Sequence, residues 1–334
     1  MVLRLRDGRG RLERMSECKR GTCFVPDTGC DLGHTDLSQC PVWGGLAATR
    51  VAVPEETDEV LMPWSGSALG LADLGFISGR ARPFVIGIAG SQNAGKTTLL
   101  GAWYLLLGRG AAQIANRQFA GSYSISGWEA VSGSLRWKPG QPPTFPPHTA
   151  SRSGRAPGLL HMSFWDNNAT RSLDYLFADA PGEWFQKWAI NRDSAEGEGA
   201  RWIADRADVF LIVADREALS GENMGAARNA LRLLARRLAD ERRGRPVALV
   251  WTKSDVAISS EMELAVRKAV MDTMPQTAEF SVSVVSDGAE GDGNGIGLDA
   301  LLSWILEVRR ERITLPSPVG SCNDSLFMYG TRPS

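Results

Sequence analysis

The chain has 334 residues, of which 43% are hydrophobic and 22% are charged, and a formal net charge of -1, which gives no sign of a protein that binds nucleic acid through bulk positive charge. No apolar run approaches the roughly 20 residues of a membrane-spanning helix, and the basic N-terminus lacks the apolar stretch of a secretory signal. We therefore expect a cytoplasmic globular protein with neither a membrane nor a nucleic acid as partner.

The first feature along the chain is a group of cysteines. Four of the five cysteines and one histidine lie close together near the N-terminus: Cys18, Cys23, Cys30, His34 and Cys40. In a reducing compartment such a cluster is more often a metal site than a set of disulfides, and four thiolate or imidazole ligands are what Zn²⁺ requires. We predict a zinc-binding head over residues 1–45, with the four cysteines as ligands and His34 as the alternate ligand. Free thiols in a loose arm remain the alternative.

After a linker over residues 46–82, apolar runs alternate between strand-like and helix-like patterns, which favours a doubly wound α/β domain over residues 83–314. We expect a tail over residues 315–334. We expect strands at 83–89, 159–165, 172–178, 208–214, 246–251 and 280–285, and helices at 97–107, Glu222–Arg243 and Leu298–Arg310. A segment rich in Gly, Ser and Pro interrupts the pattern over about 113–158, and it is too long for an ordinary connection.

The segment Gly90–Thr97, "GSQNAGKT", has the spacing of a phosphate-binding loop. Backbone N–H groups of such a loop surround a phosphate, the lysine (Lys96) bridges the β- and γ-phosphates, and the hydroxyl of Thr97 ligates Mg²⁺. Because a strand precedes it and a helix follows it, we prefer this interpretation to a plain strand-to-helix turn. The nucleotide-binding residues predicted here are Gly90, Ser91, Gln92, Asn93, Ala94, Gly95, Lys96, Thr97 and Thr98.

Two further motifs end predicted strands. Asp179-Ala180-Pro181-Gly182 places a carboxylate where it can hold Mg²⁺, and the N–H of Gly182 where it can meet the γ-phosphate. Thr252-Lys253-Ser254-Asp255 places a carboxylate that can accept two hydrogen bonds from guanine, whereas adenine offers no such pair of donors. Lys253 can pack against the base, and Thr252 is predicted as part of the same site.

In this order, the three motifs resemble those of the translation-factor-related, Ras-like P-loop GTPases over Phe84–Arg310. The resemblance implies a mostly parallel sheet, GTP or GDP as ligand, Mg²⁺ as cofactor and hydrolysis of GTP. It also implies a switch threonine that ligates Mg²⁺, for which we choose Thr149 with Thr144 as the alternative. A short loop after the last strand would place Ser286 near the base.

Three residues depart from the common pattern. Glu183 stands where Ras-like proteins commonly have a glutamine that orients water, and Gln92 stands where they have a glycine. Both are counted among the catalytic residues, with Lys96, Thr97, Asp179 and Gly182, and both predict slow intrinsic turnover. Asn93 matches an asparagine of potassium-activated GTPases of the Era and MnmE type, which implies stimulation by K⁺; an asparagine that caps the loop's own backbone is the alternative.

The cysteine-rich head, the stretched first switch and the sequence "DAPGE" together resemble the bacterial double-GTPase group. That resemblance implies a protein partner, including a second GTPase, and a role in bacterial conflict or antiviral defence. We predict a molecular switch or assembly factor. The alternative is a non-hydrolysing adaptor that recruits its partner through the zinc head and a docking patch of Trp184, Phe185 and Trp188, which would otherwise form core.

Overall fold

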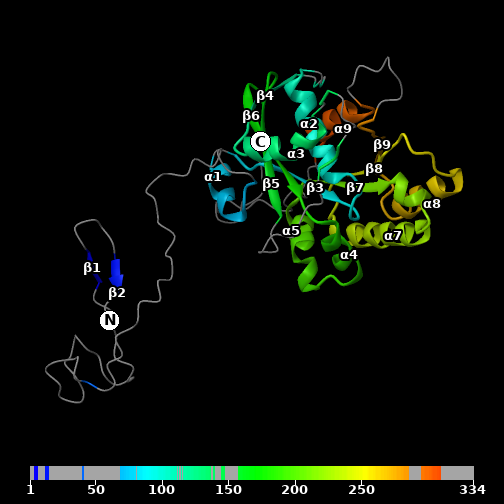
Figure 1. Cartoon of the computed structure of the whole chain (residues 1–334), viewed down its shortest axis with the longest axis horizontal. Coiled ribbons are helices and arrows are strands. Elements are labelled where there is room, and N and C mark those ends of the chain that lie inside the picture. Colours follow the sequence, from blue (N-terminus) through cyan, green and yellow to red (C-terminus); the bar gives the residue numbers. More distant parts are fainter. Residues whose placement is uncertain are drawn as a thin grey trace, which may run out of the picture. The chain divides into compact units, whose positions relative to one another are not determined.

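The computed structural model of the chain divides into two compact units, Met1–Val60 and Leu61–Ser334, each of which is described by itself. The described residues are 4–6, 12–14, 40, 68–79, 81–110, 112, 114, 116–136, 138–139, 144–146, 157–285 and 295–309. In the first unit, β1 (Arg4–Arg6) and β2 (Leu12–Arg14) pair antiparallel, and Cys40 is buried. The second unit holds the sheet and all the described helices (Figure 1).

Seven strands form one sheet in the order β4-β5-β6-β3-β7-β8-β9. From β6 to β9 each pair of neighbours is parallel, whereas β4–β5 and β5–β6 are antiparallel. The strands are β3 (Phe84–Ala89), β4 (Arg117–Gly121), β5 (Gly158–Asp166), β6 (Arg171–Asp179), β7 (Val209–Asp215), β8 (Val247–Thr252) and β9 (Ala278–Ser281). The predicted sheet and the predicted pair of strands at 159–165 and 172–178 are therefore present, and β9 lies at an edge as expected.

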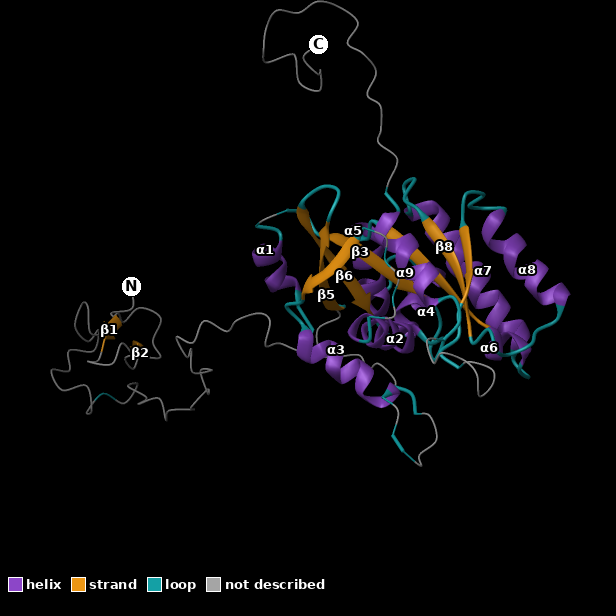
Figure 2. Cartoon of the chain, turned by 90° about the horizontal axis from the view of Figure 1, so that it is seen from above, coloured by secondary structure: helices purple, strands orange, loops and turns teal. Residues whose placement is uncertain are grey.

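Helices cover both faces of this sheet (Figure 2). They are α1 (Leu74–Ile77), α2 (Lys96–Gly108), α3 (Ile125–Ser132), α4 (Gly182–Ile190), α5 (Glu198–Arg206), α6 (Arg216–Ser220), α7 (Met224–Glu241), α8 (Ser260–Met271) and α9 (Leu298–Glu307). Short 3₁₀ turns lie at Leu71–Asp73, Gly133–Leu135 and Ala195–Gly197. Side chains alternate along the central strands, so Ile86 and Ile88 face one apolar cluster while Val85 and Ala89 face the other. Because both faces of these strands are buried, their sequences are continuous apolar runs.

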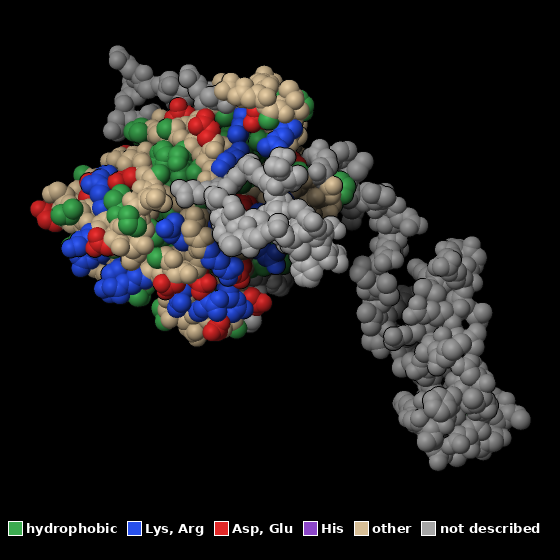
Figure 3. All heavy atoms as spheres, turned by 180° about the vertical axis from the view of Figure 1, so that it is seen from behind, with side chains coloured by type: hydrophobic (Ala, Val, Ile, Leu, Met, Phe, Trp, Pro, Cys, Tyr) green, Lys and Arg blue, Asp and Glu red, His purple; other side chains and the backbone are tan. Residues whose placement is uncertain are grey.

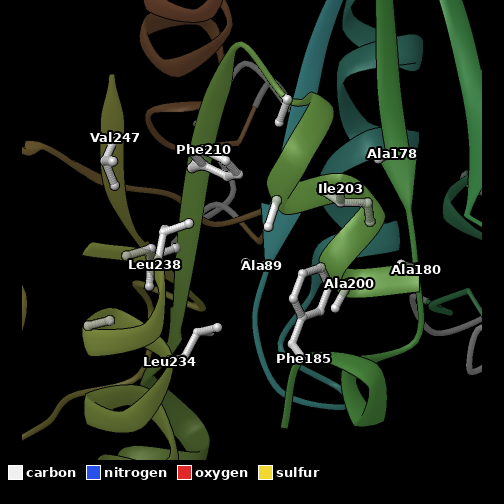
Figure 4. Packing of buried hydrophobic residues seen from close by; sticks show 14 of the residues in the cluster. Ala89, Ala178, Ala180, Phe185, Ala200, Ile203, Phe210, Leu234, Leu238 and Val247 are labelled. Atoms are coloured by element: carbon white, nitrogen blue, oxygen red, sulfur yellow. The ribbon is translucent and has the colours of Figure 1, made fainter. Parts of the chain in front are cut away.

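The aromatic residues after the "DAPGE" sequence belong to the core. Trp184, Phe185 and Trp188 are 6%, 2% and 1% exposed, and from α4 they join an apolar cluster with residues of α5, α7 and the sheet. Figure 4 shows Phe185 pointing toward Ala200 and Ile203. The docking-patch interpretation was wrong, because large aromatic side chains of a short helix are needed to fill the space against the sheet.

The Gly- and Pro-rich segment contains ordered elements that the sequence pattern did not predict. Strand β4 pairs with β5 at the sheet edge, and α3 packs against α2. Hydrogen bonds join the connection between β4 and α3 to the sheet. The N–H of Tyr123 donates to His161 Nδ1 (3.0 Å) on β5, and His161 Nε2 lies 3.1 Å from Asp174 Oδ1 on β6. Because Nδ1 accepts, the ring carries its proton on Nε2 and donates it to Asp174.

Trp128 should be the main anchor of α3. It is fully buried, its Nε1 donates to the carbonyl oxygen of His161 (2.7 Å), and it stacks on Tyr104. We expect Trp128→Ala to lower the free energy of unfolding by about 3–5 kcal/mol, measured by chemical denaturation. Ile125→Ala on the same helix is the control, since Ile125 is 38% exposed and should cost much less. Equal losses in the two variants would show that α3 is not anchored at Trp128.

On the face seen in Figure 3, Lys and Arg side chains lie interspersed with Asp and Glu. None of the described helices combines the length and the apolar character needed to cross a bilayer.

Candidate functional site

The loop between β3 and α2 has the backbone of a phosphate-binding loop. Gly95 adopts a left-handed conformation (φ 84°), as does Asn93 (φ 58°), and α2 begins at the next residue, Lys96. Gly95 is suited to this place because a side chain would strain the backbone there. The loop therefore leads directly into a helix N-terminus, whose free N–H groups and dipole favour an anion.

Lys96 is held inside this loop. Its side chain is 7% exposed, and Nζ donates to the carbonyl oxygens of Ser91 (2.6 Å) and Gly90 (3.2 Å). Burial lowers the pKa of Lys96 to about 8, although the nearby carboxylates of Asp179 and Glu183 act in the opposite direction. A buried ammonium at the start of a helix is a strong attractor for phosphate oxygens.

This pKa predicts that nucleotide affinity falls in alkaline solution. If a phosphate binds beside Lys96, its negative charge should raise the pKa of the lysine in the complex. Below a free-protein pKa of about 8 the lysine would then be protonated with and without ligand. Above that pH the free protein must take up a proton to bind, and affinity should fall by up to about tenfold per pH unit. Calorimetry of GDP binding with Mg²⁺ in two buffers checks the proton uptake, and Lys96→Met should lack the slope. A flat profile between about pH 8 and 9.5 would separate Lys96 from the phosphates.

The end of β6 meets the start of α2. Thr97 Oγ1 donates to Asp179 Oδ1 (3.2 Å), and β6 lies parallel to β3, so Asp179 comes to the same edge of the sheet as the loop. A hydroxyl and a carboxylate side by side are the oxygen ligands that Mg²⁺ prefers, so the donor set fits this ion. Two of the three predicted Mg²⁺ ligands, Thr97 and Asp179, are thus adjacent.

A second helix begins at the same place. Helix α4 starts at Gly182, and a Cβ built on Gly182 would lie 2.2 Å from the backbone N of Gln92. Only glycine permits this close approach of α4 to the loop. One hollow is lined by residues 92–98 and by Ala180, Pro181 and Gly182, so the N-termini of α2 and α4 face a common space. Two positive helix ends at one hollow favour an anion there.

Glu183 and Gln92 lie beside this hollow. Glu183 is in the first turn of α4 and partly buried, and its carboxylate partly opposes the lowering of the Lys96 pKa by burial. Gln92 is exposed and lines the hollow together with Asn93.

The segment after β8 lines part of a second hollow. Thr252 Oγ1 donates to the carbonyl oxygen of Ala94 (2.9 Å), which ties this segment to the loop. The carboxylate Oδ1 of Asp255 accepts a hydrogen bond from Ser283 Oγ (2.5 Å). Gly95, Thr98, Phe145 and Lys253 line both hollows, so the two hollows adjoin. We call them together the groove; Lys96 lines one hollow and Asp255 lines the other.

Some residues at this groove were not predicted as site residues: Phe145, Glu217 and Ser283 line it, and Asp215 contacts the lining residue Lys253. Ser286, which was predicted to lie near the base, is outside the described residues. Ser283, in the predicted strand 280–285, contacts Asp255 instead. Asp215 ends β7, and the ends of parallel strands are where ligands bind, so its place carried a signal. Phe145, 52% exposed, lines both hollows from a segment that has no pattern of its own.

Thr149, Cys18, Cys23, Cys30 and His34 lie outside the described residues. The alternative switch residue, Thr144, donates its hydroxyl proton to the carbonyl oxygen of Ser134. Within the ranges that the structure describes, no three His, Cys, Asp or Glu side chains gather as a metal ion would require. Zinc at the head and the identity of the switch threonine stay predictions.

Comparison with known families decides the relationship. The model of the Double-GTPase 2 family matches residues 84–305, two thirds of the chain. The chain belongs to this family. The matched part of this Double-GTPase 2 protein runs from β3 into α9 and includes both hollows, and the predicted resemblance to P-loop GTPases and to the double-GTPase group is confirmed.

Other comparisons are more distant. No curated protein matches the chain. Among solved structures, Roco2 RocCORdC of Methanosarcina barkeri bound to GDP is similar at 14% identity and a TM-score of 0.34, over 69% of this chain and 51% of the other. Era in complex with MgGDPNP and nucleotides 1506–1542 of 16S ribosomal RNA is similar at 18% identity and a TM-score of 0.32, over 70% of this chain and 59% of the other. The chain thus spans a little more than half the length of these two structures.

Proposed function

We propose that this Double-GTPase 2 protein binds GTP and GDP with Mg²⁺, hydrolyses GTP to GDP and phosphate, and acts as a molecular switch or assembly factor for a protein partner. The observation that carries the proposal is the groove of two adjoining hollows, one lined by a buried ammonium, Lys96, and the other by a carboxylate, Asp255. Its two ends match the phosphates and the guanine of one nucleotide.

In this proposal the residues around the phosphates have separate roles. Lys96 and the N–H groups of the loop hold the β- and γ-phosphates. The N–H groups at the start of α4, at Gly182, stabilise the negative charge that develops on the γ-phosphate during hydrolysis. Thr97, Asp179 and a switch threonine, Thr149, would hold Mg²⁺, which supplies positive charge to the phosphate oxygens when bound. Water attacks the γ-phosphorus, and the bond to the bridging oxygen of GDP breaks. Glu183 is negative when ionised, so turnover without a partner should be slow.

Calorimetry with the full chain in Mg²⁺ tests this proposal. GDP and GTP should bind and ATP should not, and Lys96→Ala should lose binding by about a hundredfold, because a charge-assisted contact to phosphate is removed. Single-turnover assays should then release phosphate from bound GTP. No uptake of either guanine nucleotide by folded protein would end the proposal.

A non-hydrolysing adaptor is the second candidate. Two residues favour it. Glu183 lies near Lys96 where a water-orienting glutamine is common, and Gln92 lines the hollow formed by residues 92–98 and 180–182. In this case GTP stays intact, and its binding serves only to recruit a partner. Single-turnover hydrolysis with and without candidate partners, including a second GTPase, distinguishes the two. Glu183→Gln should speed hydrolysis if the first candidate is right.

Stimulation by potassium is a finer part of the proposal. Asn93 is exposed and lines the same hollow as Lys96 and Gly182. A K⁺ ion bound there would supply positive charge to the phosphate oxygens. The alternative is that Asn93 only adopts the left-handed turn that asparagine tolerates, at φ 58°. Turnover in potassium and in sodium buffers of equal ionic strength should differ severalfold, and equal rates would remove K⁺ from the proposal.

The proposed organisation is a zinc head over 1–45, a linker over 46–82, the GTPase domain over 83–314 with its inserted segment at about 113–158, and a tail over 315–334. Cytoplasmic location and a role in bacterial defence complete it. Metal analysis of purified protein should find about one zinc per chain, as a four-cysteine site requires, and a Cys18→Ser, Cys23→Ser variant should lose it. Zinc retained in that variant would place the ligands elsewhere.

A further inference from the structure

The side chain of Lys253 ends between two carboxylates. Its Nζ donates to Asp215 Oδ2 (2.9 Å) and to Glu217 Oε2 (2.7 Å). Burial alone would lower the pKa of Lys253, but the hydrogen bonds to Glu217 and Asp215 outweigh it and raise the pKa. Lys253 is therefore a charged residue whose ammonium already has two partners on this chain.

The fold brings these carboxylates together. Strands β7 and β8 are parallel neighbours in which Asp215 is in register with Thr252, so Asp215 reaches the residue after Thr252. Helix α6 begins directly after Asp215, whose Oδ1 accepts the N–H of Glu217 (3.0 Å) as a helix cap. One oxygen of this buried carboxylate thus caps the helix while the other holds Lys253. The same cap fixes the backbone from which Glu217 reaches the ammonium.

Lys253 is also part of the groove. It lines both hollows, and Glu217 lines the hollow that contains Asp255. Lys253 itself has a left-handed backbone conformation (φ 54°), which a non-glycine residue adopts only where its surroundings hold it. With backbone and ammonium both fixed, the aliphatic part of the side chain is ordered before a ligand arrives. Binding then loses little further side-chain entropy.

We propose that Asp215 and Glu217 are positioning residues, which hold Lys253 in place and so strengthen guanine nucleotide binding without touching the nucleotide. This inference rests on the proposed function, because it concerns the groove assigned to the nucleotide. Its rival is a direct contact, in which the carboxylate of Glu217 accepts hydrogen bonds from the ribose hydroxyls.

A double-mutant cycle with the full chain, fluorescently labelled GDP and Mg²⁺ separates the two. We expect Glu217→Gln to weaken binding about threefold, since Glu217 is largely exposed, and Asp215→Asn about tenfold, since Asp215 is 5% exposed. Asparagine keeps the cap of α6. In a Lys253→Met background, Glu217→Gln should cause no further loss. Glu222→Gln is the control: Glu222 is exposed on the connection to α7 and should bind GDP as the unaltered chain does.

Steady-state GTP hydrolysis adds a readout that a folding defect would not reproduce. Loss of a positioning residue should raise KM with kcat unchanged, whereas partial unfolding lowers kcat with KM unchanged. An equal loss from Glu217→Gln with and without Lys253 would mean direct contact with the nucleotide and would overturn the proposal. Unchanged affinity in both Glu217→Gln and Asp215→Asn would overturn it as well. If the unaltered chain does not bind labelled GDP, it is the proposed function that fails.

Discussion

Replacing Asp255 with asparagine should change the preferred base from guanine to xanthine. A carboxylate accepts hydrogen bonds from N1–H and the exocyclic amine of guanine, whereas xanthine has a carbonyl oxygen in place of that amine. The amide of asparagine donates to this oxygen and still accepts from N1–H. Unpaired polar groups at a binding site are costly, so affinity for GDP should fall by about a hundredfold or more, and affinity for XDP should rise above it.

The surroundings of Asp255 make this effect specific. Ser283 Oγ donates to Asp255 Oδ1 (2.5 Å), and the same Oγ accepts the N–H of Val285 (3.0 Å), so a chain of hydrogen bonds orients the carboxylate. Competition of GDP, XDP and ADP against labelled GDP or XDP measures the preference. Ser283→Ala is the matched control: it should reduce affinity severalfold and keep the preference for guanine. A variant with asparagine at 255 that still prefers GDP would place the base elsewhere.

The sequence predicted the central sheet because its physical signal is local. Strands such as β7 and β8 are buried on both faces and read as apolar runs, and the predicted helix Glu222–Arg243 became α7 with two residues fewer at each end. By contrast, β4 and α3 lie in a segment rich in Gly, Ser and Pro. Their stability comes from contacts distant in sequence, such as that of Trp128 with His161, which no local pattern reveals.

The site residues also fall into two groups, those that a local motif predicts and those that only the tertiary fold brings together. Lys96, Asp179 and Asp255 stand in motifs whose spacing is fixed by the chemistry of the ligand, and the structure brings Lys96 and Asp255 to one groove. Asp215 and Glu217 act through Lys253, 38 and 36 residues away, so only the pairing of β7 with β8 unites them. The wrong prediction for Trp184, Phe185 and Trp188 has a similar cause. An aromatic run looks the same in the sequence whether it faces solvent or core.

Replacing Gly182 with alanine should abolish most GTP hydrolysis and leave GDP binding nearly unchanged. A Cβ at this position would lie 2.2 Å from Gln92 N, 2.4 Å from the carbonyl carbon of Ser91 and 2.7 Å from Gln92 Cα. These are backbone atoms of the phosphate-binding loop, so relief requires the start of α4 to move away from the loop. That movement withdraws the N–H groups that would face the γ-phosphate, at an expected loss of about 10²–10³ in kcat.

A second glycine supplies the control for this variant. Gly225 lies in the first turn of α7, and a Cβ built there meets nothing within 4 Å. Gly225→Ala should therefore stabilise the protein slightly and hydrolyse GTP normally. Because Gly182 borders the side of the hollow assigned to the γ-phosphate, Gly182→Ala should discriminate between ligands: labelled GDP binds as before, and a non-hydrolysable GTP analogue loses affinity. If both ligands bind and GTP turns over normally, α4 does not sense the γ-phosphate through this contact.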